Sequence, residues 1–120
     1  MSQYTIINLT TGETIAENVK TASSFFQRAK GLIGRRSLNP KEGLYIPGCR
    51  SIHMLFMQFP IDAIFIDQDN TITKIISNLK PFFISFGTLN SKGVIELPGS
   101  TLEGTKICIG DRLAFKNNKQ

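Results

Sequence analysis

Three side chains that could transfer protons, Asp62, Glu96 and His53, lie within apolar stretches of the sequence. Two carboxylates and one imidazole can support general acid–base catalysis, including hydrolysis, when they converge within hydrogen-bonding distance of a substrate. A lone histidine among apolar residues is, however, more often a packed and hydrogen-bonded ring than a base. The sequence therefore offers these three residues as catalytic candidates for a small hydrolase, which is our alternative hypothesis.

Asp62 belongs to the run Ile61–Asp67, in which alternation places successive side chains on opposite faces of a predicted strand. If the face that carries Asp62 is the core, the buried carboxylate needs a partner, and Arg28 or Arg36 could supply a bidentate one. Buried ion pairs are more often architectural than catalytic when no other site chemistry is present. We therefore expect this pair to tether a helix to the sheet.

Glu96 is flanked by Ile95 and Leu97, so it either faces solvent or joins Asp62 in a polar cluster. A cluster of this kind would form a pocket for a small or anionic ligand. Our leading hypothesis is therefore a non-enzymatic binding or accessory domain. The expected ligand-binding residues are Arg28, Arg36, His53, Met54, Asp62 and Glu96.

Cysteine and histidine give only weak signals for a metal site or a nucleophile. Cys49 and His53 form half of a zinc-binding pattern, and a tetrahedral site would also need a distant carboxylate. A thiol–imidazole pair would lack an identifiable oxyanion donor. We expect no metal and no cofactor. Two cysteines are too few for a disulfide scaffold, although a bridge between Cys49 and Cys108 stays open.

The charge distribution narrows the class of partner. The net charge is +5, and residues 28–50 carry most of the excess, with one acidic residue among them. This stretch has no recognised DNA- or RNA-binding signature, so nucleic acid is not an expected partner. A small or anionic ligand or a protein partner is expected, and the oligomeric state stays open.

The apolar runs fall far short of the roughly 18 residues of a membrane span. The N-terminus lacks the pattern of a signal peptide, so the expected location is the cytoplasm.

The elements that must position these residues are mostly strands. The 120 residues and 41% hydrophobic content fit one domain over 1–120. We expect a mainly β (α+β) fold, in which a twisted antiparallel sheet curls into a small barrel-like domain with one short helix near residues 23–33. The predicted strands are residues 4–9, 15–21, 43–46, 61–67, 71–77, 93–97, 106–109 and 112–115. We expect residues 81–87 (PFFISFG) to form an apolar loop over the sheet.

Three segments together resemble a known family: QRAKGLIGRRSL at 27–38, SIHMLFMQFPIDAIFID at 51–67 and VIELPGSTLEGTKICIGDRLAF at 94–115. They are similar to the domain of unknown function 192 family, and the resemblance is strongest over residues 22–115. It implies a compact β-rich domain of bacteria and archaea with no established general activity. It also implies that many relatives carry Trp at the position of His53, which weakens a shared catalytic role for this imidazole.

Overall fold

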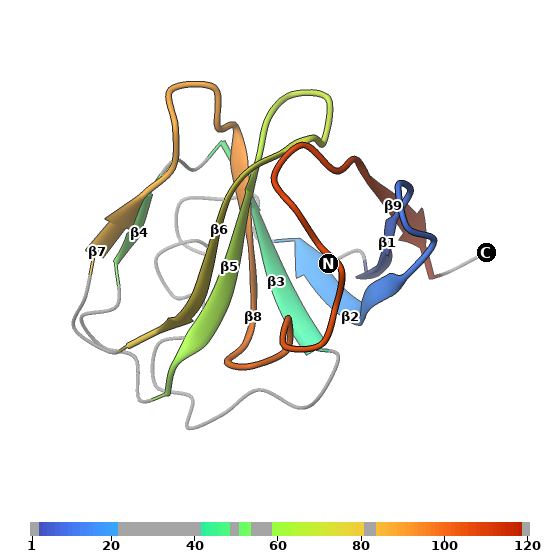
Figure 1. Cartoon of the computed structure of the whole chain (residues 1–120), viewed down its shortest axis with the longest axis horizontal. Helices are drawn as coiled ribbons and strands as arrows, with labels where there is room; N and C mark the ends of the chain where they lie inside the picture. The colour runs from blue at the N-terminus through green and yellow to red at the C-terminus, as the bar shows by residue number, and fades with distance from the viewer. Residues whose placement is uncertain (1–2, 22–41, 49–50, 54–58, 81–83, 119–120) are drawn as a thin grey trace.

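The computed structural model describes residues 3–21, 42–48, 51–53, 59–80 and 84–118, and these form nine β-strands (Figure 1). The strands are β1 (Gln3–Asn8), β2 (Thr14–Thr21), β3 (Glu42–Pro47), β4 (Ser51–His53), β5 (Ile61–Ile66), β6 (Ile72–Leu79), β7 (Ile84–Phe86), β8 (Gly93–Pro98) and β9 (Leu113–Asn117). The mainly β prediction is therefore confirmed. The helix predicted near residues 23–33 lies outside the described residues.

Seven strands form one curled sheet in the order β6-β5-β8-β3-β2-β1-β9, which makes a half-barrel (Figure 1). The two edge strands meet at one end, where Thr71 and Arg112 form an antiparallel bridge. The main chain of Ile72 also accepts from the Gly110 N–H at 2.9 Å and donates to the Asp111 carbonyl at 2.8 Å. These bonds satisfy part of both edges and remove exposed pairing groups there.

One strand pair departs from the antiparallel pattern expected of the sheet. β2 and β3 are parallel, whereas the other pairs of the large sheet are antiparallel. Parallel neighbours need a crossover of about a dozen residues or more. The interval from Thr21 to Glu42 is long enough for one. The sheet is therefore mixed.

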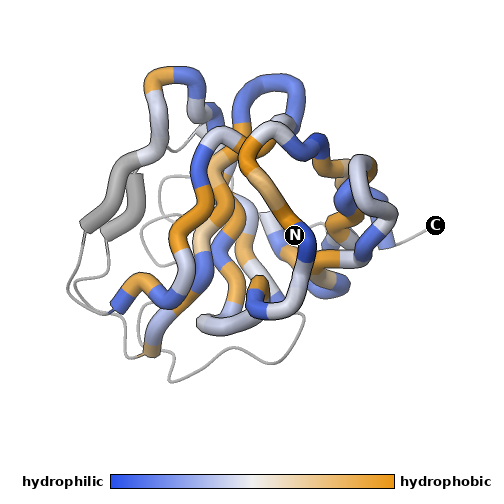
Figure 2. Tube along the Cα trace, viewed as in Figure 1, coloured by the Kyte–Doolittle hydropathy of each residue, from blue (hydrophilic) through white to orange (hydrophobic). Residues whose placement is uncertain are grey.

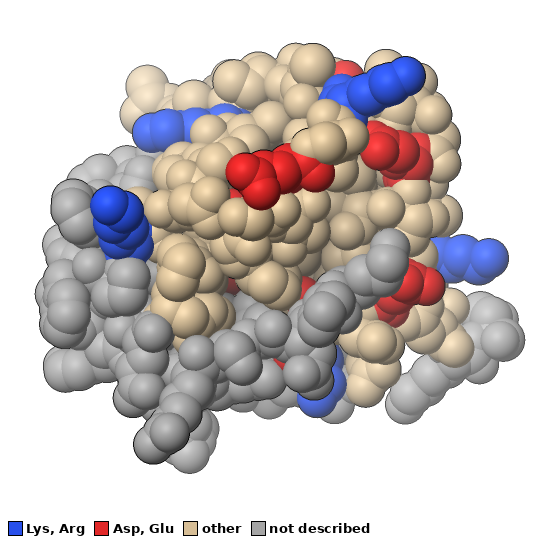
Figure 3. Space-filling model, turned by 60° about the horizontal axis from the view of Figure 1, so that its bottom comes forward, with Lys and Arg blue, Asp and Glu red and all other residues tan. Residues whose placement is uncertain are grey.

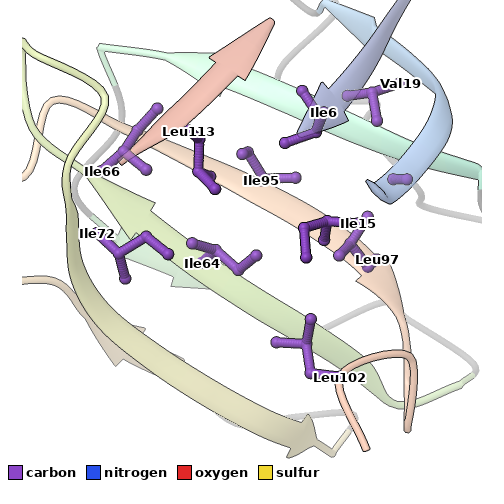
Figure 4. Close-up of a cluster of buried hydrophobic side chains, with 11 residues drawn as sticks. Ile6, Ile15, Val19, Ile64, Ile66, Ile72, Ile95, Leu97, Leu102 and Leu113 are labelled. Carbon is purple, nitrogen blue, oxygen red and sulfur yellow. The ribbon is translucent and has the colours of Figure 1, made fainter. Parts of the chain in front are cut away.

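Apolar side chains cover both faces of the large sheet. The inner face of the half-barrel holds a cluster that includes Ile64, Ile95 and Leu113 (Figure 4). The opposite face holds a second cluster that includes Phe65 and Val94. All six residues of β5 are buried, as expected of a central strand packed on both sides. Figure 2 shows these apolar stretches as orange segments of the trace.

Two of the predicted elements are wrong in the structure. Residues 106–109 form an irregular segment and not a strand, because the Asp111 carboxylate binds the Cys108 N–H at 2.9 Å and so competes with strand pairing. Ile84–Phe86, placed in a loop from the sequence, forms β7 and pairs with β4. Residues 81–83 lie outside the described part of the chain. The hairpin of β5 and β6 is confirmed, as is the last strand.

Candidate functional site

Asp62 is fully buried on β5, and its carboxylate accepts three main-chain hydrogen bonds. Oδ1 accepts from the Asn78 N–H at 2.8 Å and from the Ser100 N–H at 3.2 Å. Oδ2 accepts from the Leu102 N–H at 2.8 Å. These donors come from the end of β6 and from the turn that follows β8. Asp62 therefore ties the end of β6 and the turn after β8 to β5, which is an architectural role.

Glu96 lies on the opposite face of the sheet from Asp62. In the register of β5 and β8, Asp62 is opposite Leu97, whereas Ala63 is opposite Glu96. Side chains directly opposite in register share a face, and neighbours along a strand alternate. The structure therefore places on opposite faces the two carboxylates that our leading hypothesis joined in one polar cluster. Sequence reasoning left the facing of Glu96 open because alternation within β8 cannot relate it to β5.

Glu96 is 7% exposed as a residue and has apolar neighbours on both adjacent strands. It is flanked in register by Ala63 on β5 and by Leu44 on β3, both of which belong to the cluster on this face. Burial raises the pKa of Glu96 from 4.5 to about 7, because the charged carboxylate loses solvation. The side chain is therefore close to half protonated at neutral pH. Glu96 and Asp62 thus have opposite environments on one sheet.

The other predicted site residues are placed only in part. His53 is the last residue of β4 and pairs with Ile84 of β7 through the main chain. Arg28, Arg36 and Met54 lie outside the described residues. Their ligand-binding roles stay predictions.

A pocket of about 260 Å³ lies where five separate segments of the chain meet. Tyr4 comes from β1, Thr21 from the end of β2, Tyr45 from β3, Asn70 from the turn between β5 and β6, and Phe115 from β9. Sequence reasoning missed this site, because its members are spread over more than 100 residues. Thr21 and Tyr45 are opposite each other on β2 and β3, but this register depends on a parallel pairing that the sequence did not predict.

Three aromatic rings form the wall of this pocket. The Phe115 ring centroid lies 5.9 Å from that of Tyr4 with an interplanar angle of 77°, and 4.8 Å from that of Tyr45 with an angle of 56°. All three residues pack against the inner cluster of the half-barrel. Burial raises the pKa of the Tyr45 phenol, so its hydroxyl stays protonated at neutral pH. The wall is therefore apolar with hydroxyl groups attached.

Asn70 is held rigidly at the pocket by its turn. The Asp67 carboxylate accepts from the Asp69 N–H at 2.8 Å and from the Thr71 N–H at 3.0 Å. Asn70 adopts a φ of 62°, and its carbonyl accepts from the Leu113 N–H at 2.9 Å. The left-handed conformation is one that Asn tolerates better than most residues. The turn and β9 therefore fix the backbone that carries the Asn70 amide.

Other site chemistries find less support in the described part of the chain. No three His, Cys, Asp or Glu side chains among the described residues come together as a metal ion would require. Cys108 is an exposed free thiol, so the bridge to Cys49 left open by the sequence is not formed. On the face shown in Figure 3, the Lys and Arg side chains of the described residues lie apart from one another. The described residues contain no helix suited to crossing a membrane.

Comparison with known proteins places the chain in a family. Residues 6–115 match the model of the DUF192 family, described as uncharacterized ACR. The chain belongs to the DUF192 family. The resemblance inferred from the three sequence segments is thus confirmed. The matched range includes Asp62, Glu96 and four of the five pocket residues, and Tyr4 lies just before it.

DUF192 relatives come from archaea and bacteria. A UPF0127 protein of Thermococcus sibiricus is 31% identical over 92% of this chain and 74% of its own, and one of Pyrococcus furiosus is 29% identical over 92% and 97%. A crystal structure from Sinorhizobium meliloti, described as a candidate transcription regulator, has a TM-score of 0.82 and 28% identity over 95% of this chain and 92% of its own. A protein of unknown function from Novosphingobium aromaticivorans has a TM-score of 0.79 and 23% identity over 93% of this chain and 83% of its own. These likenesses show the fold, and the family is one of unknown function.

Proposed function

We propose that this DUF192 protein is a small-molecule-binding domain whose ligand occupies the aromatic pocket formed by Tyr4, Thr21, Tyr45, Asn70 and Phe115. The observation that carries the proposal is the convergence of three aromatic rings, three hydroxyls and one amide from five segments of the chain. Ligand pockets are typically apolar cavities with a few fixed polar groups, and they often lie in the mouths of β-barrels. This lining has that composition.

The proposal keeps the binding role expected from the sequence and moves its site. The leading hypothesis from the sequence was a site for a small or anionic ligand made by Arg28, Arg36, His53, Met54, Asp62 and Glu96. Asp62 and Glu96 face opposite sides of the sheet, so they do not support one shared polar pocket. Among the described residues, the lining of the aromatic pocket carries no formal charge, which favours an uncharged ligand over an anion.

Binding is favoured over the alternative of hydrolysis for a physical reason. The Asp62 carboxylate is fully buried and already accepts three main-chain hydrogen bonds, so it is poorly placed to take a proton from water. Glu96 would have to act without it. Hydrolysis by a carboxylate and His53 stays a prediction.

The free thiol of Cys108 is compatible with the reducing cytoplasm, the location expected from the sequence.

The test compares a variant that fills the pocket with a matched variant that does not. Thr21→Phe places a ring in the pocket at the end of β2, whereas Thr14→Phe makes the same change at the exposed start of that strand. Native mass spectrometry of gently purified protein, set against the denatured sample, measures retained ligand. Incubation with adenosine, glucose and benzyl alcohol supplies defined probes. We expect a bound mass in the wild type and in Thr14→Phe that Thr21→Phe loses.

Two results would overturn the binding proposal. One is a bound mass that survives Thr21→Phe, because the ligand would then occupy another part of the molecule. The other is an unliganded wild-type protein both before and after incubation with all three probes.

A further inference from the structure

The arrangement of the aromatic rings limits the shape of the ligand. Phe115 lies between Tyr4 and Tyr45, and both tyrosine rings are steeply inclined to it. Aromatic rings interact best in offset-stacked or edge-to-face arrangements with centroids about 4.5–7 Å apart. A flat ring that enters this angled wall can stack on one ring while it meets another edge-on. At about 260 Å³, the pocket is below the usual range for a drug-sized ligand and suits a ring-sized group.

The polar groups of the pocket limit the chemistry of the ligand's edge. Thr21 and the two tyrosines present hydroxyls, which both donate and accept, and Asn70 presents an amide with a donor beside an acceptor. Within the described residues, no side-chain hydrogen bond is formed by any of these four groups. As far as the described part of the chain is concerned, they are therefore available to a bound molecule. None of these four groups bears a formal charge, so the described lining offers no counter-charge for the hydration that a charged ligand would lose.

We infer that the pocket binds an uncharged heteroaromatic ring of the nucleobase type, with its face on the aromatic wall and its edge on the Asn70 amide. This inference rests on the proposed binding function of the pocket. An asparagine amide pairs bidentately with the adjacent donor and acceptor of adenine, and stacking on aromatic side chains holds a base by its face. The fixed turn holds the Asn70 backbone in place, which reduces the entropy lost on binding.

The test uses a pair of asparagines that share one backbone conformation. Asn70 and Asn78 both have positive φ, at 62° and 53°, and only Asn70 lines the pocket. Glycine adopts this conformation freely, so Asn70→Gly removes the amide while it keeps the turn. Asn78→Gly is the control. Adenosine is titrated into ¹⁵N-labelled wild-type and variant proteins, and the NMR shifts of the amides of Tyr4, Tyr45 and Phe115 are followed.

We expect adenosine to shift the amides of the pocket residues in the wild type and in Asn78→Gly. Asn70→Gly should weaken the affinity by roughly 5- to 150-fold, as expected for loss of a bidentate pair worth about 1–3 kcal/mol. An equal loss in Asn78→Gly, or an unchanged affinity in Asn70→Gly, would overturn the inference.

Parallel titrations with glucose and benzyl alcohol separate this inference from the function on which it rests. If either probe shifts the pocket amides and adenosine does not, the pocket binds small molecules and the nucleobase class is wrong. If none of the three probes shifts them, both the inference and the proposed function fail.

Discussion

The two buried carboxyl groups of the sheet show how strongly environment decides the role of one chemical group. The Asp62 carboxylate accepts hydrogen bonds from three main-chain N–H groups. Glu96 is one residue away in register and faces apolar side chains. The sequence shows both as acidic residues within apolar runs. Their difference depends on cross-strand register, which alternation along a single strand does not specify.

Replacing Asp62 should destabilise the protein strongly. Asp62→Ala leaves three main-chain donors without their acceptor, and each unsatisfied buried group costs about 1–3 kcal/mol. We expect the free energy of unfolding, measured with urea, to fall by at least about 3 kcal/mol. Asp62→Asn keeps one acceptor oxygen and should fall between this variant and the wild type.

Asp69→Ala is the matched control for Asp62, because Asp69 is an exposed aspartate in the neighbouring turn. It should change the unfolding free energy by no more than about 0.5 kcal/mol. A similar small effect for Asp62→Ala would contradict the tethering role.

At the scale of elements, local patterns predicted most strands because their burial follows the expected alternation or continuous apolar runs. β5 is an example, since its apolar run corresponds to a strand buried on both faces. The errors have a common cause in contacts from distant parts of the chain. Ile84–Phe86 became a strand because β4 offers a partner. Residues 106–109 did not, because a carboxylate claims the Cys108 N–H.

The pocket could not be predicted from the sequence, because it too depends on contacts between distant parts of the chain. The ring contact between Tyr4 and Phe115 requires the pairing of the first and last strands of the sheet. The contact of Tyr45 with Phe115 requires in addition that β3 lie parallel to β2. No motif in the sequence joins these residues. Only the three-dimensional register brings them together.

Asp111 should control how the half-barrel is closed between β6 and β9. Its carboxylate accepts from the Asn8 side-chain amide at 2.9 Å and from the Cys108 N–H at 2.9 Å, and its carbonyl accepts from Ile72. Asp111→Ala removes the two side-chain bonds and should lower the unfolding free energy by about 2 kcal/mol. Amide hydrogen exchange at Cys108 and Gly110 should accelerate, because the segment that carries them loses its anchor.

Asp67→Ala serves as the comparison for this effect, because Asp67 fixes the neighbouring turn through two main-chain bonds. It should accelerate exchange at Asp69 and Thr71 and leave Cys108 unchanged. Unaltered exchange at Cys108 in Asp111→Ala would show that the segment is held by other contacts.

At the scale of the whole molecule, the large sheet separates two surroundings. The inner face carries the cluster of Figure 4, with the aromatic pocket beside it. The opposite face buries Glu96 beneath apolar neighbours. Lys20 on β2 is opposite Leu44 and so lies on the same face as Glu96, but its side chain is exposed to solvent. The proposed ligand pocket and Glu96 therefore lie on opposite faces of the sheet.

Ionisation of Glu96 should make global stability depend on pH. Its pKa is about 7 in the folded state and 4.5 as the ordinary value, so the folded protein holds this proton more tightly than the unfolded chain. Stability from this group is complete below about pH 4.5, falls as the pH rises through 7, and then levels off after a loss of roughly 3 kcal/mol.

Glu96→Gln cannot ionise and should lack this decline, whereas Glu103→Gln, at an exposed position, should keep it. Urea unfolding at pH 5, 6, 7 and 8 measures the difference between each variant and the wild type. Parallel pH profiles for wild type and Glu96→Gln would mean that Glu96 ionises as readily in the fold as in water.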